Sequence, residues 1–347
     1  RGAAELLSEW DMATFNGMTI WDTTVTVTGS AAEGDWSIDV TRMSSRLFFL
    51  ESTGTVTAGG GMLGDASRRM GVIARMNSAV IDPDAALTTV GGLTYGGSAY
   101  VDGNDKNPDG WGGVCDAPGE NKPGILIDDQ AAVRYNGCDP DEVPPSPRAC
   151  DIYGNPPTDE DPTLTPDSLM VFGDMEFDDL ASIADITLRP SLRVSQLEPD
   201  SVNIGGNYIC DTSGEYNWGT PDDPGGACGN HFPIIYARGT LYIAANESAQ
   251  GILLVEGDLH ISGGHEFYGP VIIRGTLVAT GGGAGGHFYG GVIAANVILD
   301  DVTLTGNALV DYSACAVTRA VINNSSLSRV RPIDDRSWVD LSSLIRG

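Results

Sequence analysis

Tyr236-Ala-Arg-Gly-Thr-Leu-Tyr-Ile243 is the first of four short segments near the carboxyl end that share one pattern. The others are Val255-Glu-Gly-Asp-Leu-His-Ile261, Ile273-Arg-Gly-Thr-Leu-Val-Ala279 and Ala295-Asn-Val-Ile-Leu299. In each segment two short apolar stretches flank a turn residue, which is Gly or Asn. Such a unit has too little surface to bury its apolar side alone, so the repetition indicates units that stack on one another.

The spacing of the turn residues supports this interpretation. Gly239, Gly257 and Gly275 are 18 residues apart, and Asn296 follows after 21. We therefore expect a right-handed parallel β-solenoid whose rungs lie roughly 4.8 Å apart. The glycine run Gly281–Gly286 suits the tight bends that such a coil requires.

Composition limits the possible partners of this 347-residue chain. It carries 19 Lys and Arg against 47 Asp and Glu, a formal net charge of −28. That charge argues against a nucleic-acid partner and against electrostatic docking on an anionic membrane. Apolar residues make up 41% and Gly contributes 46 residues, which favours a folded, mainly β protein with many tight turns.

Residues 1–80 read as a small module of a helix followed by an antiparallel sheet. Residues 1–10 have apolar residues near helical spacing and no capping residue before them, as in the tail of a helix whose beginning is missing. We expect a processed or truncated chain. The chain contains no signal peptide and no run of 18 apolar residues that could span a bilayer. The expected strands, which alternate apolar and polar residues, are 19–28, 36–42, 46–57 and 68–76.

Residues 81–347 are expected to form the solenoid domain, with a loop-rich insertion at about 104–231. The segment 85–103 alternates in short pieces and is predicted to supply a first rung. The stretch 104–170 is polar and proline-rich with little periodicity, as in a surface excursion. Within the insertion, residues 174–184 predict a helix that Asp174 caps.

Six cysteines form an even set without any C-x-x-C pair, which weakens a zinc or redox interpretation. Disulfides that hold loops of an exported protein are the favoured hypothesis, and free thiols are the alternative. Cys210–Cys228 and one pair among Cys115, Cys138 and Cys150 are the local pairings to expect. The sixth cysteine is Cys315, and the sequence alone does not choose among the 15 possible connectivities.

One loop has the ligand spacing of a calcium site. Asp105, Asn107 and Asp109 place oxygens at the first, third and fifth positions, Trp111 offers its backbone carbonyl, and Asp116 stands at the twelfth. Hard oxygen ligands at alternate positions suit Ca²⁺. The alternative is a solvated Asp/Gly turn, because no helices flank the loop and Asp reaches an ion less well than Glu.

Three histidines occupy similar places in the repeat, each just before an apolar strand: His231, His265 and His287. They indicate either a transition-metal site or a ladder of stacked rings beside phenylalanines, and the ladder is favoured because metal ligands must converge. Paired carboxylates such as Asp178 and Asp179 suggest a glycosidase, but adjacent strand residues point to opposite faces. The motifs of serine hydrolases, P-loop NTPases, zinc proteases and dinucleotide-binding enzymes are absent from the sequence.

Three stretches of the chain resemble the PilX-like accessory proteins, or minor pilins, of type IV pilus systems. They are Ala3-Ala-Glu-Leu-Leu-Ser-Glu-Trp10, the pair Leu47–Gly54 and Ser67–Arg75, and the distal pair Gly251–Leu259 and Tyr312–Ala320. The resemblance implies a pilin-like helix and sheet followed by a β-solenoid head. The hydrophobic N-terminal helix and the processing site of that family are not present in this sequence.

The resemblance implies a non-catalytic structural or assembly subunit of the bacterial cell envelope or surface. The resemblance implies an extracellular, cell-surface or periplasmic location. We expect other protein subunits as partners, bound through residues 1–80, and a role in assembly or adhesion. The alternatives are an accessory subunit of another envelope complex and a carbohydrate-active β-solenoid enzyme.

Overall fold

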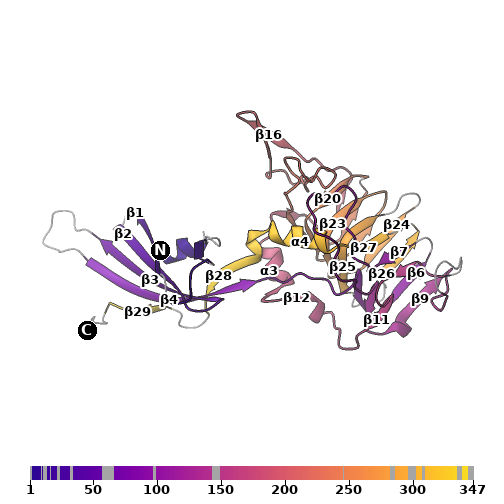
Figure 1. Cartoon of the computed structure of the whole chain (residues 1–347), viewed down its shortest axis with the longest axis horizontal. Coiled ribbons are helices and arrows are strands. Elements are labelled where there is room, and N and C mark those ends of the chain that lie inside the picture. The colour runs from indigo at the N-terminus through magenta and orange to yellow at the C-terminus, as the bar shows by residue number, and fades with distance from the viewer. Residues whose placement is uncertain are drawn as a thin grey trace. The chain divides into compact units, whose positions relative to one another are not determined.

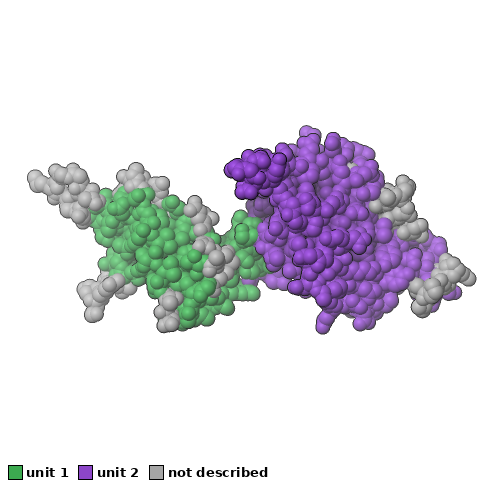
Figure 2. All heavy atoms as spheres, turned by 45° about the horizontal axis from the view of Figure 1, so that its top comes forward, with its two compact units in different colours: residues 1–79, 325–347 green, residues 80–324 purple. Residues whose placement is uncertain are grey.

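The chain forms two compact units (Figure 2). Unit 1 comprises residues 1–79 and 325–347, and unit 2 comprises residues 80–324. Among the helices that are described, none has both the length and the apolar character needed to cross a bilayer. The computed structural model describes all residues except 1, 9, 11–13, 16, 22–23, 32–33, 57–65, 97–98, 143–148, 245, 282–285, 296–301, 307–308, 334–337 and 343–347.

Unit 1 is a helix on an antiparallel sheet, as the sequence predicts. The sheet has the order β1-β2-β3-β4-β28, and β29 also pairs with β4 (Figure 1). Its elements are α1 (Gly2–Ser8), β1 (Thr24–Ala31), β2 (Gly34–Arg42), β3 (Leu47–Val56), β4 (Ala66–Ser78), β28 (Ser328–Pro332) and β29 (Trp338–Asp340). Alternation along the strands places Ile38, Val40 and Leu50 on one face, where they form a core with Ala3 and Leu6 of α1.

The last residues of the chain return to unit 1, which corrects the expected domain boundary. Residues 325–347 were assigned to the second domain, yet β28 pairs with β4 from Ser328↔Ser78 to Pro332↔Ala74. Val330 on β28 is buried in the core of unit 1. Antiparallel pairing at a sheet edge joins segments that are far apart in the sequence, and local patterning does not reveal it.

Unit 2 is built on two parallel sheets. The twelve-stranded sheet contains β5 (Leu87–Val90), β7 (Tyr100–Asp102), β8 (Ile125–Ile127), β10 (Ile152–Tyr153), β11 (Thr158–Glu160), β14 (Ile186–Leu188), β18 (Ile234–Ala237), β20 (Ser248–Gln250), β21 (Ile252–Val255), β23 (Glu266–Ile273), β25 (His287–Ala295) and β27 (Leu309–Tyr312). The seven-stranded sheet contains β6 (Leu93–Gly96), β9 (Val133–Asn136), β15 (Leu192–Val194), β19 (Leu241–Ile243), β22 (Leu259–Ile261), β24 (Leu277–Gly281) and β26 (Val302–Gly306).

The repeat in the sequence corresponds to parallel stacking, as expected. Successive turns of the chain add strands to both sheets, and Leu241, Leu259 and Leu277 are register partners on successive strands. A Cβ at Gly257 would lie 2.7 Å from the Thr240 backbone nitrogen, so this corner requires Gly. The turn of the fourth segment, Asn296, lies outside the described residues.

The inward faces of the two sheets share one apolar core. Buried side chains such as Leu253, Phe267 and Leu277 fill the space between the sheets. The outward face of the twelve-stranded sheet is apolar as well, and α3 (Phe177–Ser182) and α4 (Ala314–Ile322) contact it. These contacts explain why its strands are nearly continuous hydrophobic runs.

The position of the segment 85–103 differs from the expected first rung. Strands β5, β6 and β7 pair with β25, β26 and β27, so the first turn of unit 2 lies beside its last turn. The opposite end of the stack begins at β14 and β15, within the stretch expected to be an insertion. Strands β8 to β11 extend the stack beyond β5, β6 and β7, so residues 104–231 contribute strands to both sheets.

The helix expected at 174–184 is shorter than predicted. It spans Phe177–Ser182, and its N-cap is Glu176, whose side chain forms a capping box with Asp179, instead of Asp174. The residues before it form part of a small hairpin. The remaining elements are η1 (Gln130–Ala132), η2 (Ser168–Met170), η3 (Ser325–Leu327), β12 (Val171–Phe172), β13 (Met175–Glu176), β16 (Ser201–Ile204) and β17 (Asn207–Cys210).

Candidate functional site

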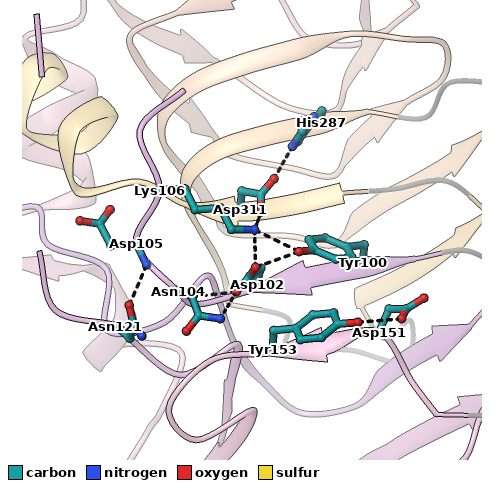
Figure 3. Close-up of polar contacts among 10 residues, drawn as sticks. All are labelled: Tyr100, Asp102, Asn104, Asp105, Lys106, Asn121, Asp151, Tyr153, His287 and Asp311. Atoms are coloured by element: carbon teal, nitrogen blue, oxygen red, sulfur yellow. Dashed lines mark hydrogen bonds and ion pairs between the residues drawn. The ribbon is translucent and has the colours of Figure 1, made fainter. Parts of the chain in front are cut away.

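A polar cluster lies where the first and last turns of unit 2 meet (Figure 3). Asp102 on β7 and Asp311 on β27 are register partners, so two carboxylates face each other on adjacent parallel strands. The ammonium of Lys106 forms an ion pair with Asp102 Oδ2 and lies 3.2 Å from Asp311 Oδ1. It also donates to the Tyr100 hydroxyl at 3.0 Å. The cation therefore offsets the repulsion between the two carboxylates.

His287, at the start of β25, extends the cluster by one strand. Its Nε2 lies 2.7 Å from Asp311 Oδ2, and its ring centroid lies 3.9 Å from that of Tyr289. Asp311 thus contacts both Lys106 and His287. Three neighbouring strands, β7, β27 and β25, are linked by side-chain contacts in addition to their backbone pairing.

The environment changes the pKa values of two members of the cluster. Burial alone would raise the pKa of Asp102, but the hydrogen bonds from Lys106, the Asn104 backbone N–H and Tyr100 hold it below its ordinary value. Burial raises the pKa of Tyr100 to about 12, although the hydrogen bond from Lys106 opposes that rise. At neutral pH the carboxylate is therefore ionised and the phenol is protonated.

These groups can hold the fold together, but they do not form a recognisable catalytic arrangement. None of the ten side chains in Figure 3 is a serine, threonine or cysteine that could act as a nucleophile next to His287. The hydrogen bonds that lower the pKa of Asp102 keep it ionised, so it is not in the neutral form that a general acid requires.

Sequence patterning missed most of this cluster. The sequence singled out only His287, as one of three histidines at similar places in the repeat, and did not connect it to Asp102, Lys106 or Asp311. The register of β7 on β27 brings Asp102 and Asp311 together across 209 residues. The sequence predicted parallel stacking, which is the basis of this register. It placed residues 85–103 at the wrong position in the stack, so the neighbours of β7 were not identified.

The expected calcium loop is closed by contacts within the protein. Asp105 Oδ1 accepts a hydrogen bond of 2.8 Å from the Ala314 N–H at the start of α4, and Asp105 Oδ2 accepts one of 2.5 Å from Gly119. Asn107 donates to the Asp116 carbonyl at 2.8 Å. Trp111 is buried, and its indole N–H donates to the Pro221 carbonyl at 2.9 Å.

The other two expected ligands, Asp109 and Asp116, are exposed. In the part of the chain that the structure describes, no three His, Cys, Asp or Glu side chains converge into a group that could hold a metal ion. Calcium binding at residues 105–116 stays a prediction, and chelation can test it.

The three histidines lie in separate environments. His231 Nε2 contacts the Asn217 carbonyl at 3.2 Å, His287 contacts Asp311, and His265 is fully buried. No ring contact between two of these histidines occurs within the described residues. Rings that stack on successive strands include Tyr268 and Tyr289, with centroids 4.5 Å apart.

The outward face of the seven-stranded sheet carries a row without acidic residues. By register the row runs through Arg193, Tyr242, His260, Val278, Thr303, Thr94 and Arg134. The rings of Tyr242 and His260 stack with centroids 4.7 Å apart, and Arg193 and Arg134 are exposed. Unit 2 contains 9 basic and 35 acidic residues, so this row is a local exception to its charge.

Three disulfides stabilise unit 2. Cys138–Cys150 and Cys210–Cys228 are local pairs, as the spacing suggested. The third bridge joins Cys115 to Cys315 across 200 residues. Sequence reasoning did not include Cys315 among the candidates, because its partner lies in the loop that follows the distant strand β7.

Neither the family models nor the curated proteins that were compared match the chain. One solved structure is similar, the crystal structure of the competence-associated pilin ComZ from Thermus thermophilus. The two chains are 11% identical, and the match covers 98% of this chain and 93% of that chain with a TM-score of 0.24. A TM-score this low does not establish a shared fold, so we infer neither fold nor function from it.

Proposed function

We propose that this chain is a non-catalytic subunit of a bacterial surface or envelope assembly, in the manner of a minor pilin. Unit 2 would be a right-handed β-solenoid head, and unit 1 would be the pilin-like module that contacts other protein subunits. The chain would act outside the cytoplasm. The sequence resemblance to PilX-like proteins motivates the proposal, and the two units provide physical support for it.

One observation carries the proposal: the first and last turns of unit 2 lie side by side in one stack of parallel strands with a filled core. The first and last turns pair strand by strand, and Cys115–Cys315 joins the segments that follow them. Such an arrangement gives a rigid body with a fixed outer surface. Rigidity of this kind suits a part that presents a surface.

The row from Arg193 to Arg134 is the attachment surface that we favour for the head. It crosses seven parallel strands, and all of its residues except Val278 have side chains that can form hydrogen bonds. The disulfides support an oxidising compartment for the chain.

The proposal can be tested in the bacterium that encodes the chain. An epitope-tagged copy is expressed, surface and envelope assemblies are isolated, and their composition is determined by mass spectrometry. We expect the tagged chain to be enriched with other exported subunits, and we expect a copy without residues 1–79 to lose that enrichment. Recovery of the intact chain only as a free soluble protein would contradict the proposal.

The enzyme alternative makes a different prediction. A carbohydrate-active solenoid would release oligosaccharides from a panel of polysaccharides, and replacement of its acidic residues would stop the release. We expect no product from the purified chain. Product formation that Asp311→Asn abolishes would favour the enzyme, because Asp311 is the carboxylate that contacts both Lys106 and His287.

A further inference from the structure

A small hairpin projects from the stacked strands of unit 2 (Figure 1). Strands β16 and β17 form a two-stranded sheet, and within the described residues each pairs only with the other. Val202 and Ile209 are opposite each other and share a face with Ile204, and they are 41%, 50% and 60% exposed. Tyr208 on the other face is 67% exposed. A cluster of exposed large apolar side chains marks an interaction surface.

The base of the hairpin is held by a disulfide and by buried hydrogen bonds, so the exposed position of its apolar side chains is defined by the fold. Cys210, the last residue of β17, is bonded to Cys228. Asn217 is fully buried, and its side-chain amide donates to the carbonyls of Asp200 and Asp211, one on each side of the hairpin. An isolated two-stranded hairpin is marginally stable by itself, so these contacts hold it in a defined conformation. A preordered element loses less entropy when it binds.

The charge of the hairpin narrows the class of partner. Residues 201–210 contain no charged side chain, although unit 2 has a net charge of 9 − 35 = −26. A basic partner would bind elsewhere on unit 2, and an anionic membrane would repel it. The aliphatic face and the free backbone edges of the hairpin instead fit an uncharged strand edge of a protein.

Unit 1 of the same chain offers such an edge. Strand β1, Thr-Val-Thr-Val-Thr-Gly-Ser-Ala, has no charged residue and no proline, and its register with β2 is unbroken over eight residues. Within the described residues β1 pairs only with β2, so its other edge is open. An edge without charge, proline or bulge lacks the usual features that prevent pairing with another chain. Val25 and Val27 on β1 are half-buried and lie beside the core of unit 1.

We propose that the β16–β17 hairpin of one copy pairs with the open β1 edge of a second copy. The aliphatic face of the hairpin would then lie beside Val25 and Val27 and extend the apolar face of the sheet. The two contacting surfaces differ, so each copy keeps one free hairpin and one free edge, and the contact builds open chains. This inference goes beyond the proposed function, which does not specify the protein partner.

The test uses sedimentation velocity on the full chain over a range of concentrations. Ile209→Asp places a charge on the hairpin, and Thr28→Lys places one on the exposed β1 edge. We expect the wild-type chain to associate and each variant alone to bind its own kind about tenfold more weakly or worse. The matched controls are Val171→Asp, at an exposed apolar residue elsewhere in unit 2, and Thr55→Lys on the interior strand β3. Both controls should associate like the wild type.

A mixture of the two variants gives the sharpest result. Ile209→Asp keeps an intact β1 edge and Thr28→Lys keeps an intact hairpin, so the mixture should form dimers that cannot grow further. Added salt should strengthen association, since it screens repulsion between chains of net charge −28.

Three results would overturn the proposal: a wild-type chain that is monomeric at every concentration, variants that associate like the wild type, or a mixture that stays monomeric. A monomeric chain that still co-purifies with envelope subunits would overturn this inference alone and leave the proposed function standing.

Discussion

Asp105 is the residue at which the calcium hypothesis and the observed contacts differ most. Its carboxylate accepts backbone hydrogen bonds from Ala314 and Gly119, and it therefore anchors the start of α4. We expect Asp105→Ala to lower the free energy of unfolding by about 1–3 kcal/mol, because two amide donors lose their acceptor. The measurement is urea denaturation with added calcium and with a chelator. A loss that occurs only with calcium would instead identify the carboxylate as a calcium ligand.

His265 predicts a pH dependence of stability. Its ring is fully buried, the Glu247 carbonyl lies nearby, and neither ring nitrogen makes a hydrogen bond of good geometry. Burial lowers the pKa of His265 to about 4, from 6.5 in an unfolded chain. Between these values the unfolded chain binds a proton and the folded chain does not, so stability falls as the pH drops from 6.5 towards 4. The contribution lost is on the order of 3 kcal/mol.

The control for this prediction is His265→Phe, because carboxylates also titrate at acidic pH. Denaturation of both proteins is measured at several pH values between 7 and 4. The wild type should lose more stability than the variant across this range. Parallel curves for the two proteins would show that His265 makes no contribution.

At the scale of elements, the inward and outward side chains of the parallel strands in unit 2 differ in what they contribute to stability. Phe288 on β25 is buried in the core, whereas Tyr242 on β19 is 37% exposed in the outward row. We expect Phe288→Ala to lower the free energy of unfolding by about 3–5 kcal/mol. Tyr242→Ala should cost about 1 kcal/mol, since it removes only a stacked ring. Guanidinium denaturation measures the loss of stability in each variant. Equal losses would contradict the assignment of Phe288 to the inward face and of Tyr242 to the outward face.

Elements with a local repeat could be predicted from the sequence, and elements defined by distant pairing could not. The 18-residue spacing of Gly239, Gly257 and Gly275 identified parallel strands because each turn resembles the next. The pairing of β5 with β25 has no such signal. The two strands differ in length, and they are not separated by the 18-residue spacing of the repeat. The same reason explains why Cys210–Cys228 was expected and Cys115–Cys315 was not.

The candidate site follows the same division. The ligand spacing of residues 105–116 lies within one short segment, so it could be recognised in the sequence. In the structure, Asp105, Asn107 and Trp111 of this segment form contacts within the protein. The cluster of Asp102, Lys106 and Asp311 depends on a register between strands from opposite ends of unit 2. Without that register, the sequence shows only two strands that contain an acidic residue and a separate lysine, and does not indicate that the three are neighbours.

On the scale of the whole molecule, charge is divided unequally between the two units. Unit 1 has 10 basic and 12 acidic residues, a net charge of −2, and unit 2 has a net charge of −26. Unit 1 can therefore approach another subunit without strong repulsion, whereas unit 2 repels copies of itself except through uncharged surfaces. This division agrees with assembly through unit 1 and display of unit 2.

The two units also predict two separable unfolding transitions. A variant that ends at Asn324 lacks β28, and with it Val330 and the pairing of β28 with β4. We expect the transition of unit 1 to lose about 2 kcal/mol or more, from the lost burial of Val330 and the lost pairing of β28 with β4. The transition of unit 2, whose residues are all retained, should be unchanged. Differential scanning calorimetry makes the comparison, and a joint fall of both transitions would show that the units do not unfold separately.

The central claim is that the first and last turns of unit 2 lie side by side in one stack of parallel strands. Peptide mapping of the unreduced protein by mass spectrometry tests it most directly, because this adjacency brings Cys115 next to Cys315. The account predicts three linked peptide pairs, Cys115–Cys315, Cys138–Cys150 and Cys210–Cys228. A different partner for Cys115, or a free thiol at that position, would contradict the adjacency of the two turns and the function that rests on it.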